Sequence, residues 1–472
     1  MELHLTLDRS RRVPLASQIA HAVRDAIMAQ RLQPGTRLPA TRDLATRLGV
    51  SRLVVVEAYA WLIAEGYAEG RPGSGTYVPA GLSVAGQIAA EIDDPPRRTD
   101  VLPARPPRFD FRPGLPALDL FPRRLWRAAL SRAALTARPD QLGYGPVEGL
   151  PQLRRLIAEY VARTRGLRVE PARVVVTLGT AQAMDLMLRA LAPVRGMALE
   201  DPGPEPVRRL ARLHGLRLHP IPVDAQGMRV DRLPTGRAAP QVVHVIPSHQ
   251  YPTGAALRLE RRLELLRWAE RHDAVILEDD YDSEFRFDQA PPVALAALDN
   301  SERVAYLGSF SKTLFPGLRL GYGIVPERLV ERVLELKWFS DRCTPVLEQL
   351  ALADWLETGV FERHIRKMRA TYARRRSTLL DALTYHFGDR VRVAGVAAGM
   401  HVLAEFDLGL SETEVLAQAS TGGVGLYPAS QCFIARKRPK AGILLGFGHL
   451  PEALITKGIA HLAEGLARRS QR

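Results

Sequence analysis

The sequence predicts an α/β protein in two parts: a small helical N-terminal domain that ends in a hairpin, and a large domain with a mostly parallel central sheet. Three observations predict this fold class. With 472 residues, the chain exceeds the size of a single hydrophobic core. Helical periodicity fills the first part of the chain, whereas short β-branched runs alternate with helical segments further on. A stretch rich in proline and arginine separates the two, so we expect domains at 1–79 and 109–472, joined by a flexible linker at 80–108.

Composition and charge narrow the classes of function. A hydrophobic content of 46% excludes wholesale disorder. The net charge of +14 is compatible with a nucleic-acid partner, but residues 1–79 hold only 10 arginines against 7 acidic residues, so DNA binding must be argued from a motif. Two cysteines, Cys343 and Cys432, form neither a disulfide framework nor a metal site, which fits a reducing cytoplasm. We find no signal peptide and no membrane-spanning run, so we expect a cytoplasmic protein without membrane contact.

The first expected element is a helix within residues 13–32, VPLASQIAHAVRDAIMAQRL. Apolar residues recur there at helical spacing and give the helix one face to bury. Two further helices are expected within residues 40–70, on either side of a tight turn at LGVS. Gly49 suits the positive φ of a helix end, and Ser51 is a good N-cap for the next helix. The pair predicts a helix-turn-helix, whose second helix enters the major groove of DNA.

A hairpin with a glycine-rich tip, a wing, is expected at residues 65–79. Together LPATRDLATRLGVSR, AYAWLIAEGY and RPGSGTYV resemble the winged-helix domain of GntR-type bacterial regulators. The resemblance implies that Arg42 and Arg52 lie at the DNA face, and that four small residues lie near phosphates or the minor groove: Thr41, Ser51, Gly73 and Gly75. Arginine can bridge guanine O6 and N7, and small residues bring backbone N–H groups close to phosphate. Alternatively, the two arginines only solvate exposed helix faces.

The large domain alternates strands with helices. The expected strands lie in RVVVTLG, GMALEDPG, QVVHVIPS, DAVILEDDY and RVAYLGSFS, and helical segments such as TAQAMDLMLRALA, EPVRRLARLHG and RLERRLELLRWAERH lie between them. This alternation predicts a mostly parallel sheet covered by helices on both faces. Ligands of such sheets bind at the carboxyl ends of the strands, and the chemically noteworthy residues fall there.

The segment SFSKTLFPGLRLGY contains Lys312, the first of only six lysines in a chain with 59 arginines. A buried lysine can lose its proton and attack a carbonyl, which an arginine cannot do. At other strand ends, TLGTAQA offers a helix N-terminus at Gly179–Ala181, and ILEDDYDSEF offers carboxylates and Tyr281. Ser309 and Arg319 flank the lysine. A phosphate seat, an acid, a phenol, a lysine and an arginine are the groups that hold pyridoxal phosphate, with the lysine as an imine.

The segment from Phe109 onward resembles fold-type-I aminotransferases, and the whole chain resembles the MocR subfamily of GntR-type regulators. The motifs behind this resemblance are FRPGLPALDLFPRRLWRAAL, LGYGPVEGLPQLRRLIAEY, EDPG, PSHQYPTG, EDDYDSEFRF and SFSKTLFPGLRLGY. The resemblance implies that Lys312 forms the imine, Asp279 contacts the ring nitrogen and Tyr281 contacts the 3′-oxygen. It also implies that the phosphate is held by Ser309, Arg319, Gly179, Thr180 and Ala181. One sequence does not fix which of Glu278, Asp279 and Asp280 is the ring-nitrogen partner.

Three departures from the aminotransferase pattern concern residues near the cofactor or the substrate. Tyr251, expected beside the cofactor, replaces an asparagine that usually precedes the proline-threonine-glycine turn. EDPG is followed by Pro204 and Glu205 where an aromatic residue is usual, with Arg208 and Arg209 later. Leu444 stands at the position of the arginine that clamps a substrate carboxylate, a contact of about 1.5–3 kcal/mol. A basic loop either reaches into the pocket or is solvated: Arg436, Lys437, Arg438 and Lys440.

These features favour a transcriptional regulator that senses an amine-bearing effector over a catalyst. Imine exchange with an effector such as γ-aminobutyrate or taurine would release Lys312 and shift the conformation of the domain. Two alternatives remain: a working aminotransferase with an attached DNA module, and a regulator of vitamin B6 genes that senses pyridoxal phosphate itself. The family resemblance implies promoter DNA as a partner and a head-to-tail homodimer in which a winged helix lies across the other subunit. The sequence leaves open the effector, the operator and the choice between activation and repression.

Overall fold

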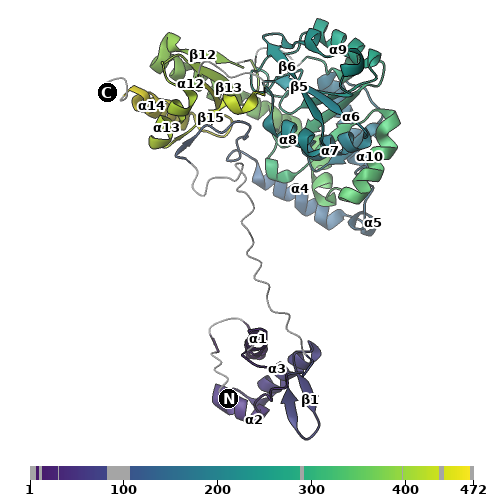
Figure 1. Ribbon diagram of the computed structural model, residues 1–472, viewed down its shortest axis with the longest axis vertical. Coiled ribbons are helices and arrows are strands. Elements are labelled where there is room, and N and C mark those ends of the chain that lie inside the picture. The colour runs from purple at the N-terminus through teal and green to yellow at the C-terminus, as the bar shows by residue number, and fades with distance from the viewer. Residues whose placement is uncertain are drawn as a thin grey trace. The chain divides into compact units, whose positions relative to one another are not determined.

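The computed structural model describes residues 7–9, 13–29, 31–81, 107–287, 292–395, 397–434 and 441–467. The chain divides into two compact units, Met1–Leu102 and Pro103–Arg472, and each is described here by itself (Figure 1). The linker expected at 80–108 lies outside the described residues except at its two ends.

The described part of the N-terminal unit folds as the expected helix-turn-helix with a wing. Its elements are α1 Leu15–Met28, α2 Thr41–Leu48, α3 Arg52–Ala64, β1 Glu69–Arg71 and β2 Gly75–Tyr77. The strands pair antiparallel, with Glu69 opposite Tyr77. One hydrophobic core joins the three helices and the wing, and Ile19, Leu44 and Val55 are at most 1% exposed in it. The apolar spacing read from the sequence is therefore the spacing of this core.

The turn between α2 and α3 is built as the sequence predicts, with one difference. Gly49 ends α2 in the left-handed region, at φ 62°, and its N–H returns to the carbonyl of Thr46. Ser51 occupies the N-cap position of α3, but its side chain makes no capping hydrogen bond. The hydroxyl is thus exposed at the start of α3 instead of accepting a hydrogen bond from its first turn.

The large unit is built on an eight-stranded sheet in the order β4-β11-β10-β9-β8-β5-β6-β7. The bounds are β4 Val174–Thr177, β5 Gly196–Asp201, β6 Arg217–Asp224, β7 Gly227–Met228, β8 Val242–Val245, β9 Val275–Asp280, β10 Val304–Ser309 and β11 Gly321–Ile324. Strands β6, β5, β8, β9 and β10 pair parallel, whereas β11 runs antiparallel to both β4 and β10. The expected mostly parallel sheet is confirmed, and all five predicted runs are strands in it.

Helices cover both faces of this sheet (Figure 1). The helices of this part of the unit are α4 Arg123–Thr136, α5 Pro139–Leu142, α6 Pro151–Arg165, α7 Thr180–Ala190, α8 Glu205–Leu213, α9 Leu259–Arg271, α10 Glu327–Ser340 and α11 Val346–Glu357. Neighbouring residues of β9 show the two layers, because Leu277 packs with residues of α7 and α10 and Ile276 packs with residues of α9. In the described ranges, no helix is both long and apolar enough to cross a membrane.

The remaining part of the large unit is a four-stranded sheet in the order β12-β13-β16-β15. Its elements are α12 Val360–Phe387, β12 Val391–Ala394, β13 His401–Phe406, α13 Glu412–Thr421, β15 Tyr427–Pro428, β16 Ala441–Gly446 and α14 Glu452–Ala467. The first strand of the unit, β3 Phe109–Asp110, pairs parallel with β14 Val424–Gly425. The amide of Gly446 donates to the carbonyl of Phe111 at 2.8 Å, so the segment after β3 lies against β16.

Candidate functional site

Lys312 lies in a turn directly after β10. Its Nζ donates to the carbonyl of Gly114 at 2.8 Å, in the segment that follows β3. A Cβ at Gly114 would lie 3.0 Å from this nitrogen, and the φ of Gly114 is +77°, so only glycine fits there without strain. Burial lowers the pKa of Lys312, whereas the charges of Asp282 and Asp279 act to raise it. A lowered pKa increases the share of neutral amine, the form that attacks a carbonyl.

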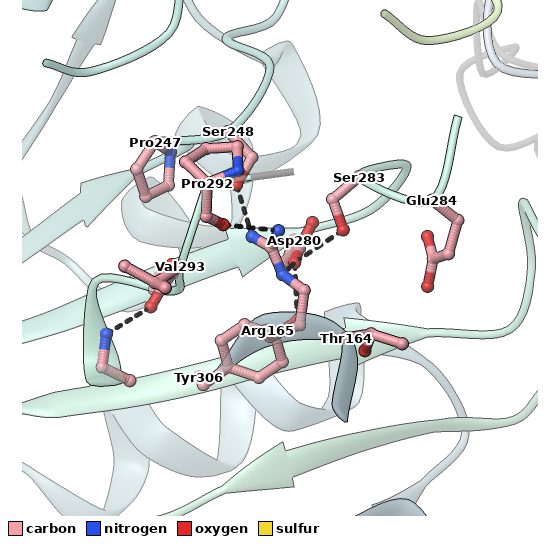
Figure 2. Close-up of polar contacts among 12 residues, drawn as sticks. Thr164, Arg165, Pro247, Ser248, Asp280, Ser283, Glu284, Pro292, Val293 and Tyr306 are labelled. Carbon is pink, nitrogen blue, oxygen red and sulfur yellow. Dashed lines mark hydrogen bonds and ion pairs between the residues drawn. The ribbon is translucent and has the colours of Figure 1, made fainter. Parts of the chain in front are cut away.

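The three carboxylates at the end of β9 have different surroundings. Glu278 accepts the backbone N–H groups of Leu295 and Ala296, both at 2.8 Å. Asp280 accepts the hydroxyl of Tyr306 at 2.5 Å and forms an ion pair with Arg165, with 2.8 Å between Nε and Oδ2 (Figure 2). The guanidinium of Arg165 also donates to Ser248 and to the carbonyl of Pro292. Two of the three carboxylates are therefore committed to structural contacts.

Asp279 differs from both of its neighbours. Successive side chains of a strand point to opposite faces, so Asp279 faces away from Glu278 and Asp280. Its Oδ2 lies 3.4 Å from Nε2 of His244, and its buried Oδ1 has no hydrogen-bond partner among the described residues. A buried acceptor without a donor is costly, so this oxygen is suited to a donor that is not part of the chain.

Tyr281 is held by a histidine that the sequence interpretation did not single out. Its phenol donates to the carbonyl of His249 at 3.2 Å and lies 3.2 Å from Nδ1 of the same residue. That Nδ1 also lies 3.1 and 3.2 Å from the two carboxylate oxygens of Asp282. Burial raises the pKa of Asp282, and His249 opposes the rise. The only signal in the sequence was the SHQ triplet before Tyr251, to which no role was given.

The expected phosphate seat lies at the N-terminus of α7. Gly179 precedes the helix with φ 109°, so that Thr180 and Ala181 begin its first turn. A Cβ on Gly179 would lie 3.5 Å from the guanidinium of Arg319, which places that cation beside the helix N-terminus. Ser309 is the last residue of β10, three residues before Lys312. Its Oγ accepts the backbone N–H of Ser311 at 3.0 Å. A helix N-terminus with an adjacent guanidinium is a natural anion site.

These groups fit pyridoxal phosphate. The chain offers an amine with a lowered pKa, a buried carboxylate oxygen without a partner, a phenol and an anion seat on adjoining strand ends. In the described part of the chain, no group of histidine, cysteine, aspartate and glutamate side chains could hold a metal ion.

The expected DNA-contacting residues lie at the starts of α2 and α3 and in the wing. Arg42, Ser51 and Arg52 are exposed, and Nε of Arg52 donates to the hydroxyl of Thr41 at 3.4 Å. In the wing, Gly73 and Gly75 have φ values of 73° and 115°. A Cβ on Gly75 would lie 3.1 Å from the guanidinium of Arg37, so the wing closes against an arginine.

Comparisons with known proteins agree with both halves. The model of the gntR family of bacterial regulatory proteins matches residues 15–78, and the model of class I and II aminotransferases matches residues 117–424. The chain is 38% identical to the probable rhizopine catabolism regulatory protein MocR of Rhizobium meliloti, over 97% of this chain and 95% of that protein. The chain belongs to the MocR subfamily of GntR-type regulators. It is a transcriptional regulator with an aminotransferase-like domain.

Other MocR-type and aminotransferase proteins extend this finding. The pyridoxine biosynthesis regulator PdxR of Corynebacterium glutamicum is 31% identical over 99% of both chains. The structure of the α-aminoadipate aminotransferase LysN from Thermus thermophilus, complexed with N-(5′-phosphopyridoxyl)-L-leucine, matches with a TM-score of 0.69 and 29% identity. That match covers 77% of this chain and 93% of LysN, so the large unit has the fold-type-I aminotransferase fold.

The turn after β8 of this MocR-type regulator is fixed by Gln250. Its amide nitrogen donates to the carbonyls of Pro202 and Tyr251 at 2.7 and 2.6 Å, and its oxygen accepts the hydroxyl of Thr253. Tyr251 hydrogen-bonds the thiol of Cys432, and burial raises the pKa of its phenol. Tyr251 is thus engaged with the four-stranded sheet side of the unit, and its place beside the cofactor stays a prediction.

The other residues at which the chain departs from the aminotransferase pattern are Leu444, Arg208 and a basic segment. Leu444 is 2% exposed and packs in an apolar cluster with Leu403, Ala429 and Cys432. Arg208 donates to the carbonyls of Gln431 and Phe433 at 2.7 and 3.4 Å. The basic residues Arg436, Lys437, Arg438 and Lys440 lie outside the described residues.

Proposed function

We propose that this regulator binds pyridoxal phosphate on Lys312 and changes its action on promoter DNA when an amine-bearing effector takes the place of that lysine. The observation that carries the proposal is the unpartnered Oδ1 of Asp279, buried on the strand beside the one that leads to Lys312. The complex of LysN with a phosphopyridoxyl amino acid supports the same ligand class here.

Pyridoxal phosphate supplies an aldehyde that condenses with primary amines and a ring that withdraws electrons. The residues of this chain would hold it as follows. Lys312 bonds to the aldehyde carbon, Asp279 accepts the proton of the ring nitrogen, and Tyr281 donates to the 3′-oxygen. Arg319 and the N-terminus of α7 would hold the phosphate, with contacts from Gly179, Thr180, Ala181 and Ser309.

Sensing is favoured over turnover by the apolar residue at position 444, where aminotransferases have an arginine. Transamination needs the substrate held so that one bond at its α-carbon is aligned with the cofactor ring. The wall that contains Leu444 offers apolar contacts in place of a guanidinium clamp. An amine can therefore displace Lys312 without a guanidinium that binds its carboxylate. The outcome is a change in the conformation of the domain instead of a reaction product.

We further propose a head-to-tail homodimer that reads two half-sites in promoter DNA. The chain exposes large apolar side chains around α4, α5 and the end of α10, among them Leu125, Leu135, Leu142, Tyr144 and Phe339. Exposed large apolar side chains of this kind are typical of a subunit interface. Dimerisation would place two winged helices on one DNA, one for each half-site.

The cofactor proposal is tested by absorbance. We expect the purified protein to take up pyridoxal phosphate and to show a visible band that Lys312→Ala removes. Lys367→Ala is the matched control, because Lys367 is an exposed lysine of α12 and should leave the band unchanged. A wild-type protein that stays colourless with excess cofactor contradicts the proposal.

Two other functions have support of their own. The relation to LysN favours a working aminotransferase, and the relation to PdxR favours a regulator that senses the vitamin itself. Sustained keto-acid release from amino acids would establish the first. Operator binding that responds to pyridoxal phosphate alone, with no spectral response to any amine, would establish the second.

A further inference from the structure

The N-terminus of α7 is held by a series of side chains that the sequence interpretation did not single out. Leu178, the residue before Gly179, donates its backbone N–H to Oε1 of Gln182 at 2.8 Å. The amide nitrogen of Gln182 in turn donates to Oδ2 of Asp341 at 2.9 Å. Asp341 lies in the turn between α10 and α11, so a segment far along the chain holds the residues that lead into α7.

The carboxylate of Asp341 is itself bound by a lysine of the interior. Nζ of Lys337 donates to both carboxylate oxygens, at 2.7 and 2.8 Å, and the lysine side chain is fully buried. The same nitrogen donates to the hydroxyl of Thr344 at 3.2 Å, and that hydroxyl donates to the carbonyl of Val176 at 3.2 Å. Lys337 therefore joins the turn after α10 to β4, the strand that leads to α7.

Two further contacts restrict Gly179, the first residue of the expected phosphate seat. Its carbonyl accepts the hydroxyl of Thr177 at 3.1 Å. A Cβ on Gly321 would lie 2.8 Å from the Cα of Gly179, so β11 packs directly against it. Backbone N–H donors bind an anion best when they already point at it, because no ordering is then required. The direction of these donors depends on the peptide group before Gly179, which Gln182 holds.

Stability alone does not account for this network. The helices α7 and α10 already share an apolar cluster, in which Leu186 packs with Val333. A buried ion pair is seldom more stabilising than apolar side chains of the same size, so a lysine and an aspartate here need another reason.

We propose that Lys337 and Asp341 position the phosphate seat through Gln182, and that they thereby set the affinity of the site for the phosphate group of its ligand. None of the three side chains need touch the ligand, so they are positioning residues. The inference rests on the proposed function, since it presumes a phosphate at the N-terminus of α7.

The test compares pyridoxal phosphate with pyridoxal, which has the same aldehyde and lacks the phosphate. Full-length protein freed of cofactor is titrated with each, and the absorbance band that Lys312 forms with the aldehyde reports binding. Gln182→Leu keeps the bulk of the side chain and removes both hydrogen bonds. We expect this variant and Asp341→Ala to bind pyridoxal phosphate at least about tenfold more weakly than the wild type, with less than about a twofold change for pyridoxal.

Gln152→Leu is the matched control, because Gln152 is an exposed glutamine of α6 that donates to Glu357 at 3.0 Å, and both affinities should stay unchanged. Gln182→Leu leaves the pair of Lys337 and Asp341 intact, so it decides the question if Asp341→Ala does not fold. Equal weakening of both ligands would mean that the network only stabilises the domain, and unchanged affinities would mean that α7 needs no such support. Either result overturns the inference and leaves the proposed function standing. A wild-type protein that binds pyridoxal as tightly as pyridoxal phosphate contradicts the phosphate seat itself, and the proposed function fails with it.

Discussion

His249 and Asp282 form a buried pair beneath the candidate cofactor site, with Nδ1 of the imidazole 3.1 and 3.2 Å from the two carboxylate oxygens. The same histidine offers its backbone carbonyl to the phenol of Tyr281. One residue therefore positions two others at the end of β9. Asp282 is also the first of the charges that favour the protonated form of Lys312.

Replacing His249 should cost stability, because it leaves a buried carboxylate without its donor. We expect His249→Ala to lower the free energy of unfolding by about 1–3 kcal/mol at neutral pH, as measured by denaturant unfolding. Adding Asp282→Asn to this variant should recover part of the loss, since the stranded charge is removed. If Asp282→Asn lowers the unfolding free energy of the His249→Ala variant by as much as it lowers that of the wild type, the two residues are not coupled.

Glu200 should make the stability of the chain without cofactor depend on pH. Burial raises the pKa of Glu200 from its ordinary 4.5 to about 8, and its Oε1 has no hydrogen-bond partner among the described residues. The folded protein holds this proton more tightly than the unfolded chain, so the contribution to stability is present below pH 4.5 and is lost as the pH rises toward 8.

Glu200→Gln keeps the shape and removes this titration. The variant should match the wild type near pH 4 and exceed it by up to about 5 kcal/mol in unfolding free energy near pH 9. Glu159→Gln is a suitable control, because Glu159 is 46% exposed and paired with Arg155 on the surface of α6. A constant difference between Glu200→Gln and wild type across this range would mean that folding leaves the pKa of Glu200 unchanged.

The ion pair between Arg165 and Asp280 should be far more sensitive than surface pairs. Both side chains are 3% exposed, so Arg165→Met leaves a buried carboxylate uncompensated and should destabilise the protein by about 3–5 kcal/mol. Arg155→Met on the same helix breaks an exposed pair with Glu159 and should cost at most about 1 kcal/mol. Thermal or denaturant unfolding of the two variants, side by side, measures the contrast. Similar losses of unfolding free energy in the two variants would mean that Asp280 is exposed to solvent.

Arg52 should contribute to the reading of a base. If it does, Arg52→Ala should weaken binding to the specific operator by about 1–3 kcal/mol and relax the base preference at one position. Arg24→Ala is the control, since Arg24 lies on α1 near Glu65, with 3.8 Å between the charged atoms. Equal losses on operator and random DNA would make Arg52 a phosphate contact, and no loss on either would mean that α3 is not the recognition helix.

The sequence predicted the fold well where local pattern and burial coincide. The apolar periods of α1 to α3 and the β-branched runs of β4, β5, β8, β9 and β10 all became buried elements. Strand β11 was not predicted, because its glycines at 321 and 323 resemble a turn in a sequence. Packing requires the first of them, since a Cβ on Gly321 would lie 2.8 Å from Gly179.

Sequence motifs were enough to predict the segments of the candidate site, but not which of their side chains contact one another. Lys312 and Asp279 stand in recognisable segments, and their roles stay predictions. The choice among three consecutive acids could not be made from one sequence, because it depends on which face of β9 meets Arg165 and which meets His244. His249 was overlooked for the same reason: its partner Asp282 is distant in the chain and adjacent only after the two strands pair.

The contact between Lys312 and Gly114 also has a mechanical consequence. Gly114 lies five residues beyond Phe109, which is fixed to β14 as the first strand residue of the large unit. The chain that continues from Phe109 toward the N-terminus is the one that carries the DNA-binding unit. Any event that takes the amine of Lys312 away from the Gly114 carbonyl therefore removes one hydrogen bond from the segment that follows the first strand of the large unit.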